Sequence, residues 1–91
     1  MSAVFACNFT NHLYALAANL LAENDLKFDL IKPLIKETAS KILTTTPKNA
    51  QTGPAVRNDE QTLKSHEAML VKQPALLEIY KTLSNSIKKH N

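Results

Sequence analysis

Residues 1–23 read MSAVFACNFTNHLYALAANLLAE, and the first 22 of them carry no charged side chain. This stretch decides the fold class, because its apolar spacing predicts one long helix from about Ala3 to Glu23. The large apolar residues of the helix are Val4, Phe5, Phe9, Leu13, Leu16, Leu20 and Leu21. A helix that is apolar on nearly all sides normally lies inside a protein. We therefore expect a central, buried helix.

The same stretch is predicted neither to cross a membrane nor to direct secretion. Four polar side chains interrupt it, each costly in hydrocarbon: Asn8, Asn11, His12 and Asn19. A signal peptide carries Lys or Arg before its apolar run, and no basic residue precedes this one. We expect no membrane partner and a cytoplasmic location.

A second helix is predicted after a turn at residues 23–25. It opens near Asp29, a suitable N-cap, and places Pro33 in the first turn, where proline is tolerated. It ends before Pro47. Residues 46–58 then form a long connection that holds the only glycine and two of the four prolines. Long connections in small domains are uncommon and often functional.

Two more helices complete the prediction. The third opens at Asn58, which forms a capping-box-like pair with Gln61, and runs to about Val71 with a weak apolar stripe. The fourth opens at Pro74. Its apolar stripe consists of Leu76, Tyr80, Leu83 and Ile87. The predicted fold class is all-α, a small single-domain bundle of about four helices over residues 1–91.

The composition excludes several classes of site. The chain has a single glycine, whereas a P-loop and a G-x-G-x-x-G dinucleotide turn each need two or more. One cysteine excludes an internal disulfide and a cysteine-rich zinc site, and no metal is expected. The net charge of +3 is mild. The lysines near the C-terminus lack interleaved aromatic residues, so they indicate a solvated face and no nucleic-acid partner.

The first helix needs more apolar cover than three short helices supply. A second copy of the chain, or a domain absent from it, is the natural source of that cover. We therefore expect an intertwined homodimer. The abrupt start in an apolar helix further predicts that the chain is a fragment of a longer protein.

One candidate site lies on the first helix. Asn8, Asn11 and His12 stand at i, i+3 and i+4 and share a face, with Cys7 one turn before Asn11. Their amide and imidazole groups suit a substrate carbonyl or a cofactor amide. Equally, they suit hydrogen bonds to neighbouring helices or across a dimer interface. Cys7 has no neighbouring charge to lower its pKa, so we expect it in the core.

A second candidate site lies in the segment QTGPAVRND, residues 51–59, where the pair Gly53-Pro54 indicates a defined turn. Arg57 precedes a predicted helix N-terminus, where its guanidinium and the backbone N–H groups could meet an anion. The chemistry alone favours a simpler interpretation, a local pair between Arg57 and Asp59 that fixes the turn. On the following helix, Asp59, Thr62 and His66 share a face, and such a histidine is usually structural.

The chain resembles a known family on three stretches taken together. These are FACNFTNHLYALA at residues 5–17, PLIKET at 33–38, and QTGPAVRND at 51–59 followed by His66. The resemblance covers essentially all 91 residues. It points to the helical C-terminal domain that follows a Rossmann-type NAD(P)-binding domain in a bacterial family of oxidoreductases. That family is similar to pyrroline-5-carboxylate reductases, ketopantoate reductases and β-hydroxyacid dehydrogenases, and its helical domain is like that of 6-phosphogluconate-dehydrogenase-type enzymes.

The resemblance implies a division of labour. The N-terminal Rossmann domain of the same polypeptide would bind NAD(P), and the helical domain would close the substrate cleft and form the dimer. Related dehydrogenases place a Lys-x-x-x-Asn pair on the first helix of this domain. The matching residues here are Cys7 and Asn11, so the asparagine carries over and the catalytic lysine does not. His12 or His66 could replace it as proton donor, because histidine is the side chain that titrates nearest neutral pH.

The leading hypothesis is therefore a dimerisation and substrate-cleft domain of an NAD(P)-dependent oxidoreductase that is inactive alone. It assigns Asn11, His12 and His66 to catalysis. It assigns a small-molecule substrate to Asn8, Thr52, Gly53, Arg57 and Asp59. The alternative hypothesis is a stand-alone helical module that binds another protein through an exposed apolar surface.

Overall fold

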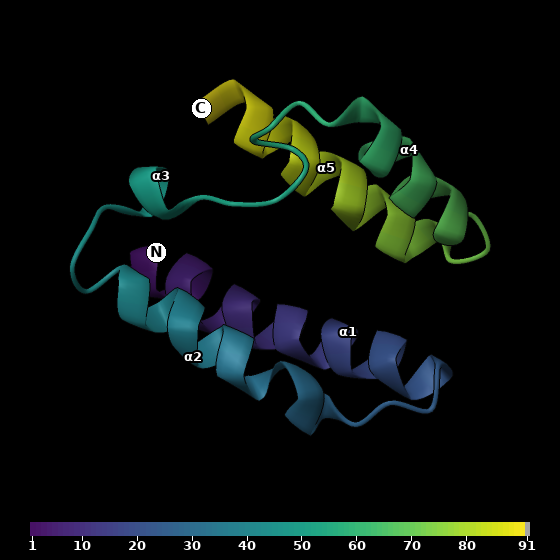
Figure 1. Cartoon of the computed structure of the whole chain (residues 1–91), viewed down its shortest axis with the longest axis horizontal. Helices are drawn as coiled ribbons and strands as arrows, with labels where there is room; N and C mark the ends of the chain where they lie inside the picture. The colour runs from purple at the N-terminus through teal and green to yellow at the C-terminus, as the bar shows by residue number, and fades with distance from the viewer. Residues whose placement is uncertain (91) are drawn as a thin grey trace. The chain divides into compact units, whose positions relative to one another are not determined.

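The computed structural model describes residues 1–90, and every element in that range is helical (Figure 1). Five α-helices, one π-helical segment and one 3₁₀ segment occur there, and no strand. The all-α prediction is confirmed, with two short helical segments and one short α-helix beyond the four helices expected. The chain divides into two compact units, residues 1–41 and residues 42–91, which are described separately below.

The first unit begins with the long apolar helix that the sequence predicts, but its start is not α-helical. The π-helical segment η1 (Val4–Phe9) leads directly into α1 (Thr10–Glu23). The Thr10 hydroxyl donates to the carbonyl oxygen of Phe5 at 3.3 Å, a five-residue spacing that matches the wider π turn. Phe5 and Phe9 pack edge to face, with ring centroids 5.1 Å apart.

Helix α1 ends in a Schellman motif built on Asp25. Asp25 adopts a left-handed backbone, with φ 57°. Its N–H donates to Ala22, and the N–H of Leu26 donates to Leu21 at 2.9 Å. These two bonds satisfy carbonyl groups that the end of a helix leaves open. The turn predicted at residues 23–25 is confirmed, and its geometry explains why the chain reverses there.

The second helix differs at its start from the prediction. A 3₁₀ segment, η2 (Phe28–Ile31), precedes α2 (Lys32–Lys41). Asp29 lies inside η2 and pairs with Lys32 at 2.6 Å. The prediction of Asp29 as the helix N-cap is therefore wrong, because the extra 3₁₀ turn starts the helical path at Phe28. Pro33 lies in the first turn of α2, as expected.

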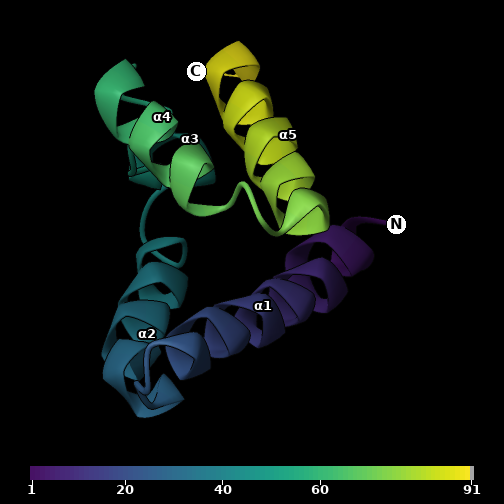
Figure 2. The same cartoon turned by 90° about the vertical axis from the view of Figure 1, so that its right-hand side faces the viewer.

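Helices α1 and α2 diverge from their connecting turn (Figure 2). The backbone of η2 packs against α1, whereas α2 makes no close backbone approach to α1. As a result, no residue of the first unit is buried. Phe5 is 64% exposed and Phe9 51%. Within this chain the first helix is therefore not buried, and η2 provides the close packing against it. The sequence predicts that the remaining cover comes from a second copy or an absent domain, and this stays a prediction.

The second unit contains α3 (Pro47–Ala50), α4 (Glu60–Met69) and α5 (Pro74–His90). Helix α3 lies in the predicted connection, so the prediction of residues 46–58 as one continuous loop is wrong in part. Pro47 provides a helix-compatible start, and the Thr46 side chain caps it by accepting from the N–H of Asn49 at 3.3 Å.

The cap of α4 is one residue later than predicted. Asp59 is the N-cap, and its carboxylate accepts from the N–H of Thr62 at 3.1 Å. Asn58 instead adopts a left-handed backbone with φ 54°, which asparagine tolerates well. The chain turns at Asn58 and the helix starts behind Asp59, so the capping-box prediction for Asn58 and Gln61 is wrong.

Helices α4 and α5 pack against each other, and Figures 1 and 2 both show them side by side. Three apolar residues form the buried core, all in this unit: Ala55, Leu63 and Leu70. The weak stripe predicted on the third helix thus supplies two of the three core side chains. Helix α5 starts at Pro74 as predicted, although Leu83 of its stripe is 44% exposed.

In the described part of the chain, residues 1–90, no helix combines the length and the apolar character that crossing a membrane requires.

Candidate functional site

The predicted polar group of the first unit lies at the junction of η1 and α1. Asn8 belongs to η1, and Asn11 and His12 belong to the first turn of α1. All three side chains are exposed, so none of them is an internal cap between helices. A π-helical segment often marks a functional position in a helix. Cys7 is also exposed, so its prediction as a core residue is wrong.

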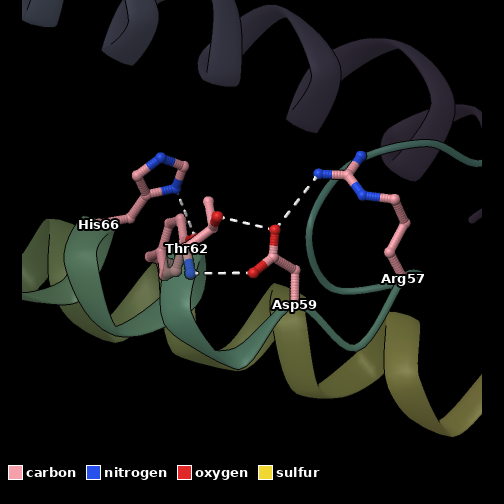
Figure 3. A network of polar contacts seen from close by, with 5 residues as sticks. Arg57, Asp59, Thr62 and His66 are labelled. Carbon is pink, nitrogen blue, oxygen red and sulfur yellow. Dashed lines mark hydrogen bonds and ion pairs between the residues drawn. The ribbon is translucent and has the colours of Figure 1, made fainter.

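The second unit holds a polar network at the start of α4 (Figure 3). The Asp59 carboxylate accepts two hydrogen bonds from Thr62, one from its N–H at 3.1 Å and one from its hydroxyl at 2.7 Å. The guanidinium of Arg57 lies 3.7 Å from the same carboxylate. The structure therefore contains the local pair of Arg57 and Asp59 that the sequence favoured.

This network lowers the pKa of Asp59 below its ordinary value of 3.8. The largest cause is the hydrogen bond from the Thr62 hydroxyl, followed by the bond from its N–H, with a smaller contribution from the charge of Arg57. Asp59 therefore stays ionised at neutral pH, and its carboxylate occupies the N–H of Thr62 at the start of α4. Arg57 keeps an exposed guanidinium, whose other N–H groups can donate to a carboxylate or a phosphate.

The turn before this network depends on Gly53. Gly53 has φ 102°, a backbone conformation that L side chains rarely adopt. Thr52 is exposed, and its carbonyl oxygen accepts from the Gln51 side-chain amide at 3.0 Å. Pro54 follows, and its carbonyl oxygen accepts from the N–H of Asp59 at 2.9 Å. The Gly-Pro turn thus sets the path of the backbone that carries Arg57 and Asp59.

His66 lies one helical turn beyond Thr62 and contacts α5. Its Nδ1 lies 2.8 Å from the hydroxyl of Tyr80, and the two rings meet edge to face at 5.7 Å. Figure 3 shows the other ring nitrogen of His66 pointing away from both helices. His66 can therefore offer one nitrogen to a ligand while Tyr80 holds the other.

Tyr80 is a residue that the sequence reasoning counted only as part of an apolar stripe. Burial raises its pKa, the carboxylate of Glu67 raises it further, and a hydrogen bond with Ser84 lowers it. A half-buried tyrosine normally requires a partner for its hydroxyl, and this requirement was the available signal. Its partner could not be identified without the pairing of α4 with α5.

The structure thus brings Arg57, Asp59, Thr62 and His66 to one face of the second unit, while Asn8, Asn11 and His12 share a face of the first. Within residues 1–90, no group of three or more His, Cys, Asp or Glu side chains is arranged to hold a metal ion. Each face offers hydrogen-bond donors and an imidazole. Such groups can bind an oxygen-bearing substrate and supply a proton to it.

Comparison with known proteins identifies the family. The chain is similar to a Bacteroides fragilis protein whose crystal structure is titled a "putative NADP oxidoreductase", with 53% sequence identity and a TM-score of 0.94. The match covers 97% of this chain but 34% of that one, so the chain spans about a third of its relative and corresponds to its C-terminal region. No curated protein matches. The model of the family described as a domain of unknown function, DUF2520, matches residues 1–87, and the chain belongs to that family.

Proposed function

We propose that the chain forms the substrate-cleft and dimerisation part of an NADP-dependent oxidoreductase. The observation that carries this proposal is the 53% identity, over nearly the whole chain, to the C-terminal region of a protein titled a "putative NADP oxidoreductase". Sequences this similar share their fold, and the two exposed polar faces described above provide groups suited to a small oxygen-bearing substrate.

The residues of this chain do not fit a dinucleotide. Such a site needs a strand, a glycine-rich turn and a helix whose N-terminal N–H groups meet the pyrophosphate. Residues 1–90 contain no strand. The one glycine turn leads to a helix whose N-terminus is occupied by the carboxylate of Asp59, which would repel a pyrophosphate. In this proposal, NADP binds to an N-terminal domain of the same polypeptide.

A fluorescence titration with NADPH tests this division. A longer protein, in which a Rossmann domain precedes this chain, should bind NADPH, and residues 1–91 alone should not. Binding of NADPH by residues 1–91 alone contradicts the division. A longer protein that fails to bind NADPH contradicts the oxidoreductase function.

In this proposal each polar face is considered by itself as a candidate substrate site. On the second unit, Arg57 would bind a carboxylate or a phosphate beside Thr52, Gly53 and Asp59, and His66 would supply the proton. On the first unit, Asn8 and Asn11 would orient a carbonyl group, and His12 would supply the proton. The variants His12→Asn and His66→Asn in the longer protein separate these roles. General acid catalysis contributes about 100-fold or more, so the variant that removes the proton donor should lose at least that much turnover.

Each of the two variants serves as the control for the other. Backbone amide spectra establish that both variants are folded, since His66 is half-buried and contacts Tyr80. A loss of turnover confined to one folded variant identifies the proton donor. Undiminished turnover in both contradicts a histidine mechanism.

The homodimer is proposed on the exposure of the first unit. Large apolar side chains are exposed both on the η1–α1 helix and on η2 and α2: Phe5, Phe9, Leu13, Leu30 and Leu34. Because α1 and α2 diverge, the corresponding helix of a second copy could enter between them and cover these residues. The apolar burial so gained would drive association.

Sedimentation at micromolar concentration tests the dimer. The unmodified chain should sediment as a dimer, and Phe9→Ser should shift it toward the monomer. Leu43→Ser is a matched control, because Leu43 is 83% exposed and lies outside the first unit. A monomeric unmodified chain contradicts the dimer and favours the alternative, a helical module that binds a different protein.

A further inference from the structure

A polar side-chain contact between His66 and Tyr80 joins α4 to α5. His66 comes from the middle of α4 and Tyr80 from the first half of α5, fourteen residues later. Both side chains are half-buried. The distance of 2.8 Å is that of a good hydrogen bond. Either group could be the donor, and which one donates decides the chemistry of His66.

The chemistry of the two groups favours the phenol as the donor. A phenol O–H is a stronger hydrogen-bond donor than an imidazole N–H, and an imidazole nitrogen is a stronger acceptor than a phenol oxygen. Burial and the carboxylate of Glu67 raise the pKa of Tyr80, so its hydroxyl keeps its proton at neutral pH. That proton is available to Nδ1 of His66 at 2.8 Å.

We infer that Tyr80 is a positioning residue whose hydroxyl donates to Nδ1 of His66 and so fixes the ring in the tautomer with its proton on Nε2. A neutral imidazole has one donor nitrogen and one acceptor nitrogen. With Nδ1 accepting from Tyr80, Nε2–H is the donor, and Figure 3 shows this nitrogen pointing away from the helices. The ligand group it suits is a carbonyl or carboxylate oxygen.

Arg57 offers a second hydrogen-bond donor on the side of α4 that carries His66. Arg57, Asp59 and His66 lie on the same side in Figure 3, with Thr62 between them. The two donors, a guanidinium and an imidazole N–H, would face the same ligand. The role of His66 toward substrate rests on the proposed function, whereas its tautomer does not, so the two can be tested separately.

Nitrogen-15 spectra of the imidazole rings of residues 1–91 test the tautomer directly. The His66 signal is assigned by its loss in His66→Asn. We expect neutral His66 to carry its proton on Nε2 alone. Tyr80→Phe keeps the ring contact but removes the donor, so both tautomers should appear in that variant.

Tyr14→Phe is the matched control, because Tyr14 lies in α1 and belongs to the first unit. It should leave the His66 signal unchanged. A proton on Nδ1 in the unmodified chain, or an unchanged tautomer in Tyr80→Phe, overturns the inference. Backbone amide spectra establish that each variant is folded.

Turnover of the longer oxidoreductase tests the consequence. Groups that orient a functional histidine typically contribute about 10-fold or more, so Tyr80→Phe should lower kcat by about 10-fold with a smaller change in KM. The pH dependence of kcat should also change, which a purely structural residue would not cause. If His66→Asn leaves kcat unchanged, the proposed role of His66 fails while the tautomer result stands.

Discussion

The ammonium group of Lys88 lies 2.9 Å from the carboxylate of Glu60 and joins the last turns of α5 to the first turn of α4. A weaker pair follows along the same two helices, with Lys81 4.0 Å from Glu67. The two pairs show that α4 and α5 run antiparallel, as the short connection between them requires. They hold the helix that carries His66 against the helix that carries Tyr80.

The pair of Lys88 and Glu60 should contribute modestly to stability. A double-mutant cycle with Lys88→Ala and Glu60→Ala should give a coupling of about 0.5 kcal/mol, because exposed ion pairs are screened by water. Urea unfolding of the four proteins measures it. The coupling should shrink at high salt. A coupling that is independent of salt would contradict an electrostatic origin.

Because Asp59 caps α4, the stability of the chain should depend on pH in the acid range. The folded pKa of Asp59 is lowered, so its contribution is present above its ordinary pKa of 3.8 and is lost as the pH falls through that value toward the folded pKa. Asp59→Ala should lower the melting temperature at neutral pH and weaken this acid dependence. Thermal unfolding followed by circular dichroism between pH 7 and about pH 3 measures both.

Asp59→Asn is the matched control for that variant. Asparagine also caps helices well but carries no charge. It should recover most of the melting temperature at neutral pH without recovering the acid dependence. Equal melting temperatures for Asp59→Ala and the unmodified chain would contradict the capping role.

Tyr80 should ionise at a higher pH than an ordinary tyrosine. Because burial and Glu67 raise its pKa, the stability that the protonated phenol contributes is present below the ordinary value of 10.0 and is lost as the pH rises through the folded pKa. Absorbance titration of Tyr14→Phe, which leaves Tyr80 as the only tyrosine, measures this ionisation.

Glu67→Gln in that background should lower the pKa of Tyr80 toward its ordinary value, because it removes a neighbouring negative charge. Glu78→Gln is a control on α5, since Glu78 is not among the groups that shift Tyr80. An equal response to both variants would mean that Glu67 has no specific effect on Tyr80.

Gly53 should resist replacement. Its φ of 102° is unfavourable for any residue with a Cβ atom, although a Cβ there would meet nothing within 4 Å. Gly53→Ala should therefore destabilise the second unit by about 1–2 kcal/mol through backbone strain alone. Thr52→Ala, at the exposed neighbour, should change stability by less than about 0.5 kcal/mol. Urea unfolding distinguishes the two, and equal effects would contradict the strain.

The amino-acid sequence by itself determined the all-α fold class, the presence and approximate extent of the four longer helices, and the resemblance to the helical region of an oxidoreductase family. A single glycine argues against β-hairpin and nucleotide-loop architectures, and Pro74 marks the start of α5. The sequence also indicated that Arg57 and Asp59 form a local pair. These features depend on neighbours along the chain, so local physical rules suffice to predict them.

Only the tertiary structure decided which side chains meet across helices and which remain exposed. The caps at Asp29 and Asn58 were mispredicted, because an extra 3₁₀ turn moves the first N-cap two residues earlier, to Lys27, and a left-handed residue moves the second one residue later, to Asp59. Tyr80 reaches His66 because α5 packs on α4, a contact between residues far apart in sequence. The exposure of α1 likewise depends on the angle at which α2 leaves it. The spacing of apolar residues along the chain predicts each helix but not the angle between the two.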